Sequence, residues 1–150
     1  MEIIKGTTEY LDECIAALKD SELGRYYFSR EDSVRDAVEE GLNAGTLYIA
    51  VEGTAFQGFL YYIPNGAFHS FPYLHLIVTK ASERGKGVGA KMLLFLESIV
   101  NKPKIFLCVA DFNPNAKRFY EKSGYMQVGR IESLYRLGIA ENLMMKEINK

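Results

Sequence analysis

The stretch Arg84-Gly85-Lys86-Gly87-Val88-Gly89 lies between an apolar segment, residues 74–78, and an amphipathic one, residues 92–100. Its three glycines leave backbone N–H groups uncovered by side chains. A helix that begins directly afterwards directs its unpaired N–H groups and its positive dipole end at the same point. Because Arg84 and Lys86 add positive charge, we expect a binding site for a phosphate or pyrophosphate. The alternative is a surface turn in which the glycines only relieve strain.

Composition indicates an ordinary globular protein. The chain has 150 residues, of which 48% are hydrophobic and 25% charged, with a net charge of −1. This predicts one domain over residues 1–150. Cys14 and Cys108 lack the spacing of a metal or redox pair, so we expect a cytoplasmic location and no metal. The N-terminus does not resemble a signal peptide, and no apolar run reaches membrane-spanning length. We expect neither a membrane nor a nucleic-acid partner.

Hydrophobic periodicity predicts alternating strands and helices. Helical spacing covers residues 11–18, 34–42, 88–99 and 114–123, and a capping pattern at Ser29 precedes the second of these. Strand-like runs cover residues 2–5, 47–51, 56–63, 73–78, 105–110, 125–131 and 143–148. The order β-α-α-β-β-β-α-β-α-β-β predicts an α/β fold with one mixed sheet flanked by helices.

Two motifs carry a resemblance to a known family. Val78 followed by Arg84-x-x-Gly87-x-Gly89 at a helix start is similar to the acetyl-CoA-binding motif of the GCN5-related N-acetyltransferase (GNAT) family. The next strand and helix also match, through Asn113-x-x-Ala116-x-x-x-Tyr120-Glu121-Lys122-x-Gly124-Tyr125. The motifs span residues 70–130, and the element order covers the whole chain. Val78 and Arg84 are one position further apart than is usual in the family, which predicts a bulge at the strand end or in the loop.

The same loop also matches a looser dinucleotide-binding pattern, Gly85-x-Gly87-x-x-Ala90, with Asp111 after the next strand. That pattern needs its glycines at the strand end, whereas polar residues 79–84 intervene here. The chain is also short for two mononucleotide-binding halves, and the strands before the loop follow one another without helices. A Walker A motif is excluded because no Gly-Lys-Ser/Thr occurs. The family resemblance is therefore the stronger interpretation.

The resemblance implies transfer of an acetyl group from acetyl-CoA to a primary amine of a small molecule or a protein. It implies that the backbone of Leu76, Ile77 and Val78 pairs with pantetheine, and that an N–H near Val78 stabilises the oxyanion. Residues 84–89 would hold the phosphates. Asn113 is expected to be a helix N-cap and, by resemblance, a pantetheine contact. The alternative function is a non-catalytic acyl-CoA-binding module with the same fold.

Tyr120 matches the family's general acid, which protonates the departing thiolate. A core position on an amphipathic helix is the alternative. A phenol with a pKa of about 10 protonates a thiolate with a pKa of about 8.5 only at a cost of roughly 2 kcal/mol. Positive charge from Lys117, Arg118 and Lys122 on the same helix could offset that cost.

The general base is left open by the sequence. Family members often place a carboxylate on the strand that precedes the glycine loop, but this strand has none and offers His75 instead. Strict alternation predicts that His75 shares a face with Tyr73 and Ile77. Glu22, Glu132 and a water chain are the alternatives, and His69 is expected to be exposed.

Charge is distributed unevenly along the chain. Residues 9–40 contain ten acids and four bases, whereas residues 80–122 contain nine bases and four acids. The acidic segment includes the two helices that border the acceptor cleft in the family, so a cationic amine such as a polyamine or a lysine-like amine would be attracted there. Solvated helix faces give the same pattern without function. The oligomeric state, including a homodimer, is left open.

Overall fold

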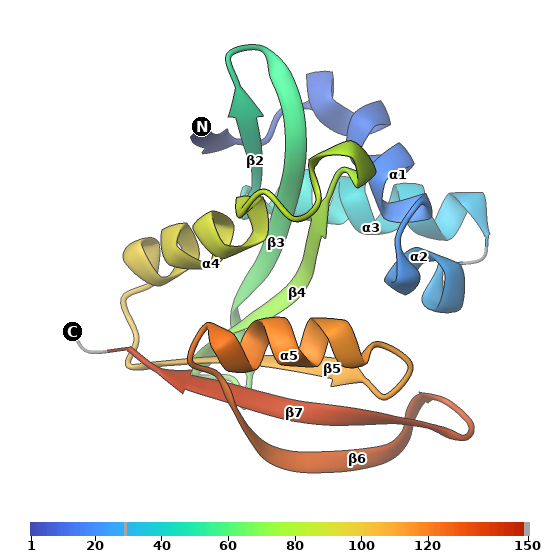
Figure 1. The fold of residues 1–150 in the computed structure, drawn as a ribbon, viewed down its shortest axis with the longest axis vertical. Coiled ribbons are helices and arrows are strands. Elements are labelled where there is room, and N and C mark those ends of the chain that lie inside the picture. The colour runs from blue at the N-terminus through green and yellow to red at the C-terminus, as the bar shows by residue number, and fades with distance from the viewer. Residues whose placement is uncertain (29, 149–150) are drawn as a thin grey trace. The chain divides into compact units, whose positions relative to one another are not determined.

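The computed structural model describes residues 1–28 and 30–148 (Figure 1). The strands are β1 (Glu2–Lys5), β2 (Leu47–Glu52), β3 (Ala55–Ala67), β4 (Phe71–Thr79), β5 (Lys104–Ala110), β6 (Met126–Arg136) and β7 (Ile139–Glu147). The helices are α1 (Leu11–Lys19), α2 (Glu22–Tyr27), α3 (Glu31–Ala44), α4 (Val88–Ile99) and α5 (Pro114–Lys122), with 3-10 turns η1 (Thr8–Tyr10) and η2 (Ala81–Glu83). None of these helices is long and apolar enough to cross a membrane.

The seven described strands form one mixed sheet in the order β1-β2-β3-β4-β5-β7-β6. The pairs β1–β2 and β2–β3 are antiparallel, β4 and β5 are parallel, and β7 is antiparallel to both β5 and β6. The predicted fold class, with one mixed sheet flanked by helices, is confirmed, and the order of elements agrees apart from one additional short helix, α2. The run of antiparallel strands before the glycine loop also excludes the doubly wound parallel sheet of the dinucleotide-binding alternative.

Three features were not predicted. Helix α2 has only six residues, too few for an apolar stripe, and it begins where the Ser21 side chain accepts a hydrogen bond from the Gly24 amide at 3.0 Å. Strand β6 continues beyond residue 131, where the predicted strand ended. The prediction stopped short because this exposed edge strand has no regular alternation of apolar and polar residues. Turn η2 occupies the extra length between β4 and the glycine loop, where an irregularity was predicted but not a 3-10 turn. The capping position expected at Ser29 lies outside the described residues.

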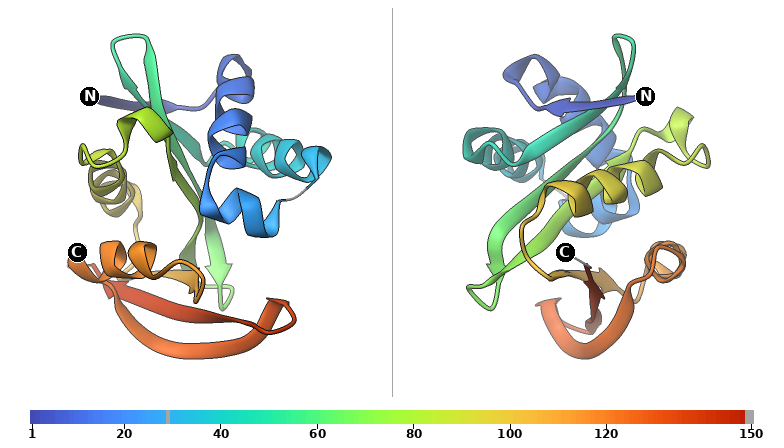
Figure 2. Two further views of the ribbon diagram at one scale, coloured as in Figure 1. Left: turned by 45° about the vertical axis from the view of Figure 1, so that its right-hand side comes forward. Right: turned by 90° about the vertical axis from the view of Figure 1, so that its left-hand side faces the viewer.

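The chain divides into two compact units, of which the first comprises residues 1–62 and 76–96. In this unit α1 packs against α3 (Figures 1 and 2). Strand β2 contacts helices on both of its faces. The ring of Tyr48 lies 4.9 Å from the ring of Phe95 in α4, and Leu47 on the other face lies next to Gly41 of α3. These contacts bury a core that includes Ile49 and hold α3 and α4 against β2.

The second unit comprises residues 63–75 and 97–148 within the described range. Helix α5 packs on β5, and the buried side chains of Ile105, Leu107 and Met144 form the strand side of its core. The end of β5 is held by a network in which Arg130 donates to both oxygens of Asp111, while Asn142 donates to Asp111 at 3.0 Å. This network positions the segment that leads into α5.

Candidate active site

The glycine loop has the backbone geometry that an anion site requires. Gly85 and Gly87 have φ values of +78° and +84°, and a Cβ added at either would meet no other atom within 4 Å. The Gly87 carbonyl accepts the bond from the Lys91 amide at 3.1 Å, so Gly87 is the N-cap of α4. The amides of Val88, Gly89 and the next residue come before this first bond of the helix, so they have no acceptor within it, and glycine has no side chain that could cap them. These residues suit a phosphate group.

The charged side chains of the loop already have partners within the first unit. The Arg84 guanidinium donates to the carbonyl of Asp20 at 2.5 Å, which attaches the loop to the C-terminal end of α1. Lys86 lies 3.3 Å from Glu83, and Glu83 also accepts from Gln57 at 3.1 Å. The Gln57 bond, followed by Lys86, lowers the pKa of Glu83. Arg84 therefore positions the loop as well as adding charge to it.

Strand β4 reaches the loop with alternating burial, as predicted. Leu76 and Val78 are buried, and Ile77 is half-buried on the opposite face. The Val78 carbonyl faces β3, because a Cβ added at Gly58 would lie only 2.5 Å from that oxygen. Just beyond the strand, the Lys80 amide donates to the Gln57 carbonyl at 2.8 Å. The end of β4 is thus paired with β3 along one edge.

The start of α5 confirms the predicted cap. The Asn113 side chain accepts from the Ala116 amide at 3.2 Å, and Pro114 occupies the first helical position. Asn113 therefore stabilises the helix end by satisfying an otherwise unpaired N–H group.

Tyr120 lies on the inner face of α5, in the second unit. It is 8% exposed, with its ring 5.2 Å from Phe119 and 6.0 Å from Tyr125. Burial raises the pKa of Tyr120 well above that of an ordinary phenol. Nearby cations would instead lower the pKa of Tyr120, but Arg118 and Lys122 on the same helix are exposed to solvent. The hydroxyl is firmly protonated at neutral pH but is a weaker acid than free tyrosine.

His75 lies on the half-buried face of β4, with its ring 6.4 Å from that of Tyr73. This confirms the predicted shared face. Burial, followed by contacts with Cys108 and Tyr135, raises the pKa of Tyr73. This pair of a hydroxyl and a thiol was not predicted, because Cys108 lies within the apolar run of β5.

The alternative carboxylate bases lie on exposed surfaces. Glu22 pairs with Arg25 at 2.8 Å, and Glu132 pairs with Arg130 at 2.9 Å. Glu141, which was not predicted, is only 2% exposed and lies opposite Ala110 of β5. The sequence signal for Glu141 was a carboxylate at the start of a strand, before an apolar run. It was missed because the predicted strand began only at residue 143, which left Glu141 outside it.

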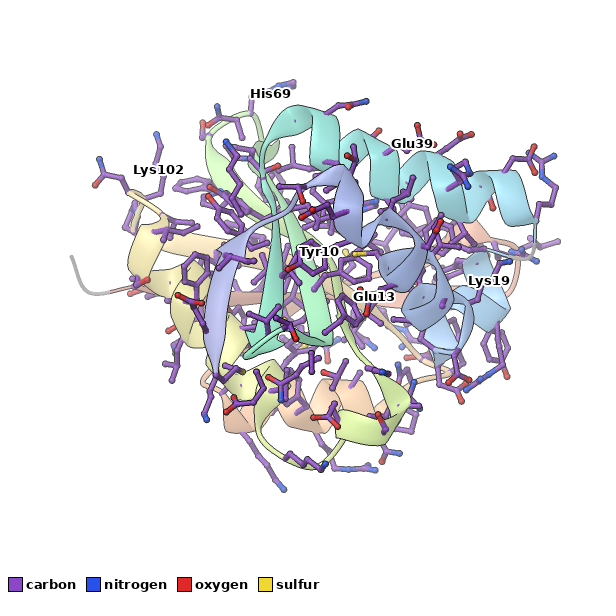
Figure 3. The ribbon with its side chains drawn as sticks, turned by 90° about the horizontal axis from the view of Figure 1, so that it is seen from above. Tyr10, Glu13, Lys19, Glu39, His69 and Lys102 are labelled. Carbon is purple, nitrogen blue, oxygen red and sulfur yellow. The ribbon has the colours of Figure 1, made fainter. Side chains whose placement is uncertain are left out.

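His69 is exposed, as predicted, and its side chain points outward from the turn between β3 and β4 (Figure 3). Among residues 1–28 and 30–148, no group of three or more His, Cys, Asp or Glu side chains could hold a metal ion.

Two carboxylates of the acidic segment in the first unit have local side-chain partners. Glu39 points outward from α3 (Figure 3) and pairs with Arg35 at 3.5 Å. Glu40 accepts a 2.6 Å bond from the Tyr61 hydroxyl. Exposed acids in this segment also include Glu9, Asp12, Glu13, Asp32 and Asp36. A negative surface remains on α1 and α3.

Comparison with known proteins identifies the family. A model of the Acetyltransferase (GNAT) family matches residues 12–125. The chain therefore belongs to this family, and it is an acyltransferase. A sequence search of curated proteins finds no match.

Solved structures share the fold over the whole chain. A GNAT-family acetyltransferase from Bacillus cereus is 21% identical with a TM-score of 0.82, covering 99% of this chain and 98% of that one. An aminoglycoside 6'-acetyltransferase type Ii is 25% identical with a TM-score of 0.81, covering 100% and 99%. A spermidine N-acetyltransferase chimera that includes the Vibrio cholerae protein is 16% identical with a TM-score of 0.79, covering 97% and 94%.

Proposed function

We propose that this protein transfers the acetyl group of acetyl-CoA to a primary amine of a small molecule or a protein. The observation that carries the proposal is the glycine loop, where Gly85 and Gly87 face open space at the start of α4. Amides of Val88 and Gly89 would bind the pyrophosphate, with Lys86 exchanging its exposed ion pair with Glu83 for a phosphate at little cost. Two of the similar structures act, by their names, on an aminoglycoside and on spermidine, which supports an amine acceptor.

The backbone of β4 would bind the pantetheine arm along one edge. Because the carbonyl of Val78 faces β3, alternation directs the amide and carbonyl of Ile77 toward the opposite edge, with Leu76 again facing β3. Ile77 is therefore the residue among these three whose backbone would pair with the extended arm. By the same alternation Thr79, rather than Val78, would supply the N–H for the oxyanion.

Two side chains would move the protons. The amine nitrogen forms a bond to the acetyl carbon, the thioester C–S bond breaks, and coenzyme A leaves as a thiolate. Tyr120 would donate its phenolic proton to that thiolate, and His75 would accept the proton that the amine loses. The protonated state of Tyr120 at neutral pH supports the first role, although its raised pKa makes the transfer less favourable. Asn113 would act mainly by fixing the start of α5.

Replacing the proposed base should alter the pH profile. In His75→Gln the loss of the imidazole should remove the acidic-limb inflection of kcat/KM between roughly pH 6 and 8, where histidine titrates. The affinity for acetyl-CoA, measured by calorimetry, should remain unchanged. Tyr73→Phe, on the same face, is the matched control and should keep the inflection. An unaltered profile in His75→Gln would eliminate the imidazole and leave Glu22, Glu132, Glu141 or a water chain.

The exposed acids of α1 and α3 favour a cationic acceptor such as a polyamine or a lysine-like amine. We expect such amines to have a higher kcat/KM than neutral amines of the same size. The advantage should shrink as salt is added, because exposed charges are screened over about 8 Å near physiological ionic strength. The measurement is the initial rate of coenzyme A release at several salt concentrations. Equal rates for charged and neutral amines at every salt concentration would show that the acids are only a solvated surface.

The remaining expectations complete this proposal. One catalytic domain would span residues 1–150, acting in the cytoplasm, where Cys14 and Cys108 would stay reduced. No metal would be needed for the reaction.

A further inference from the structure

Polar side chains from neighbouring strands meet on one face of the second unit. Tyr73 and His75 share the half-buried face of β4, and Tyr73 lies opposite Phe106 of β5. Paired residues point to the same side of a sheet, and so does every second residue along a strand, which places Cys108 on this face as well. The Tyr73 hydroxyl is hydrogen-bonded to the Cys108 thiol, as this placement requires.

Glu141 extends this group onto β7. Cys108 lies opposite Leu143, and Glu141 is the second residue before Leu143, so it is on the same face. Burial, and beyond it the negative charge of Glu141, raises the pKa of the Cys108 thiol, so the two side chains are near each other. Glu141 is only 2% exposed, although Cys108 and Leu143 beside it are half-buried. A carboxylate withdrawn from water attracts a cation more strongly than an exposed one, because the local dielectric is low.

A bulge in β6 brings a second phenol to this face. Ile131 lies opposite Glu141, and the register between β6 and β7 shifts directly after it. Within this bulge the Ser133 backbone is left-handed, with a φ of +52°. The Tyr135 side chain reaches the Tyr73 hydroxyl and is still exposed, so it lies at the solvent edge of the group. Bulges redirect side chains in this way next to binding sites.

The spacing of the strands sets the distance from His75 to Glu141. They lie on β4 and β7, which flank β5. With neighbouring strands about 4.8 Å apart and a rise of about 3.3 Å per residue, the registers put their Cα atoms about 12 Å apart. If one nitrogen is hydrogen-bonded to the imidazole and a second to the carboxylate, the two nitrogens are roughly 6–9 Å apart. A chain of about four to six methylenes spans that distance.

We propose that Glu141 determines acceptor specificity by binding the second ammonium group of an α,ω-diamine while the first amine is acetylated at His75. This inference rests on the proposed acetyl transfer and deepens it by naming the substrate class. An alkylamine with a pKa of about 10 is protonated at neutral pH, so the second nitrogen carries the charge that the carboxylate binds. The Tyr73 and Tyr135 hydroxyls can accept further hydrogen bonds from the ammonium group.

A chain-length series tests the distance between the two groups. We would compare α,ω-diamines from 1,2-diaminoethane to 1,8-diaminooctane with n-alkylamines of the same length. The kcat/KM of amine-dependent coenzyme A release should peak for diamines with about four to six methylenes, whereas the monoamines should show no such peak. Equal kcat/KM for diamines and monoamines at every length would overturn this proposal. No acetylation of any amine would instead contradict the proposed acetyl transfer itself.

Removing the charge should abolish the preference for diamines. Glu141→Gln should lower kcat/KM for the best diamine by roughly 10- to 100-fold, the loss expected for a hydrogen bond to a charged group, and leave the matching monoamine nearly unchanged. Glu147→Gln is the matched control, because it removes the same charge from the exposed end of β7, where Glu147 pairs with Lys104 at 3.7 Å. It should change neither rate. An equal loss for both amines in Glu141→Gln would assign Glu141 a structural or basic role and overturn the proposal.

Shortening the side chain tests direct contact. Glu141→Asp keeps the charge but withdraws it by one C–C bond, about 1.5 Å, so the best diamine should be longer by about one methylene. An unchanged optimum would show that the carboxylate does not touch the acceptor. Calorimetry on protein saturated with coenzyme A measures diamine binding without the reaction. Equal diamine affinities of the wild type and Glu141→Gln in that measurement would also overturn the proposal.

Discussion

Tyr120→Phe should lower kcat by 10²–10⁴-fold, the range expected when a general acid is removed. The substitution keeps the ring, so the contacts with Phe119 and Tyr125 remain. The melting temperature and the dissociation constant of acetyl-CoA should therefore change little. Single-turnover kinetics with a primary amine would measure the chemical step, and calorimetry would measure the binding.

Phe119→Leu provides the control for packing, since it changes a neighbouring ring without removing a hydroxyl. Phe119→Leu should lower the melting temperature while leaving kcat close to that of the wild type. If Tyr120→Phe retained full turnover, the residue would be a core side chain, as its 8% exposure also allows. If a lower stability of Tyr120→Phe fully accounted for its lower activity, the hydroxyl would likewise have a structural role.

Gly87→Val should weaken acetyl-CoA binding severely. The isopropyl group would occupy the open space beside the first amides of α4, where the phosphates are expected to bind. Each hydrogen bond to a charged group is worth about 1.5–3 kcal/mol, so losing one or two raises the dissociation constant by roughly 10- to 100-fold or more. The φ of +84° adds a backbone cost of about 1–2 kcal/mol to the free energy of folding.

Gly53→Val separates these two effects. Gly53 also has a positive φ, +61°, and open space around it, but it lies in the turn between β2 and β3. It should lose a similar amount of stability while keeping its affinity for acetyl-CoA. Equal affinities in the two variants would show that the glycine loop is a surface turn whose glycines only relieve strain.

Local sequence signals predicted the parts of the site that depend on local geometry. Glycines at 85 and 87 permit the left-handed backbone that the loop adopts, Asn113 followed by a proline specifies a helix start, and alternation placed Tyr73 and His75 on one face. Each of these features depends on residues within a few positions of one another, which is why the sequence alone contains them.

The features that were not predicted depend on contacts between distant segments. Arg84 bonds a carbonyl 64 positions away, at Asp20, and no periodicity encodes that choice. The raised pKa of Tyr120 comes from burial, which depends on how α5 packs on β5. Glu141 is buried because its strand lies between β5 and β6, a position that only the strand order reveals.

The most direct measurement of the central claim is the joint release of coenzyme A and formation of an N-acetylated product from acetyl-CoA and a primary amine. Coenzyme A is followed with a thiol reagent and the product by mass spectrometry, and thioester hydrolysis without amine is subtracted. We predict amine-dependent release that saturates with both substrates, with one N-acetylated product per coenzyme A. Release that is no faster with any amine than without, while acetyl-CoA still binds, would contradict the account.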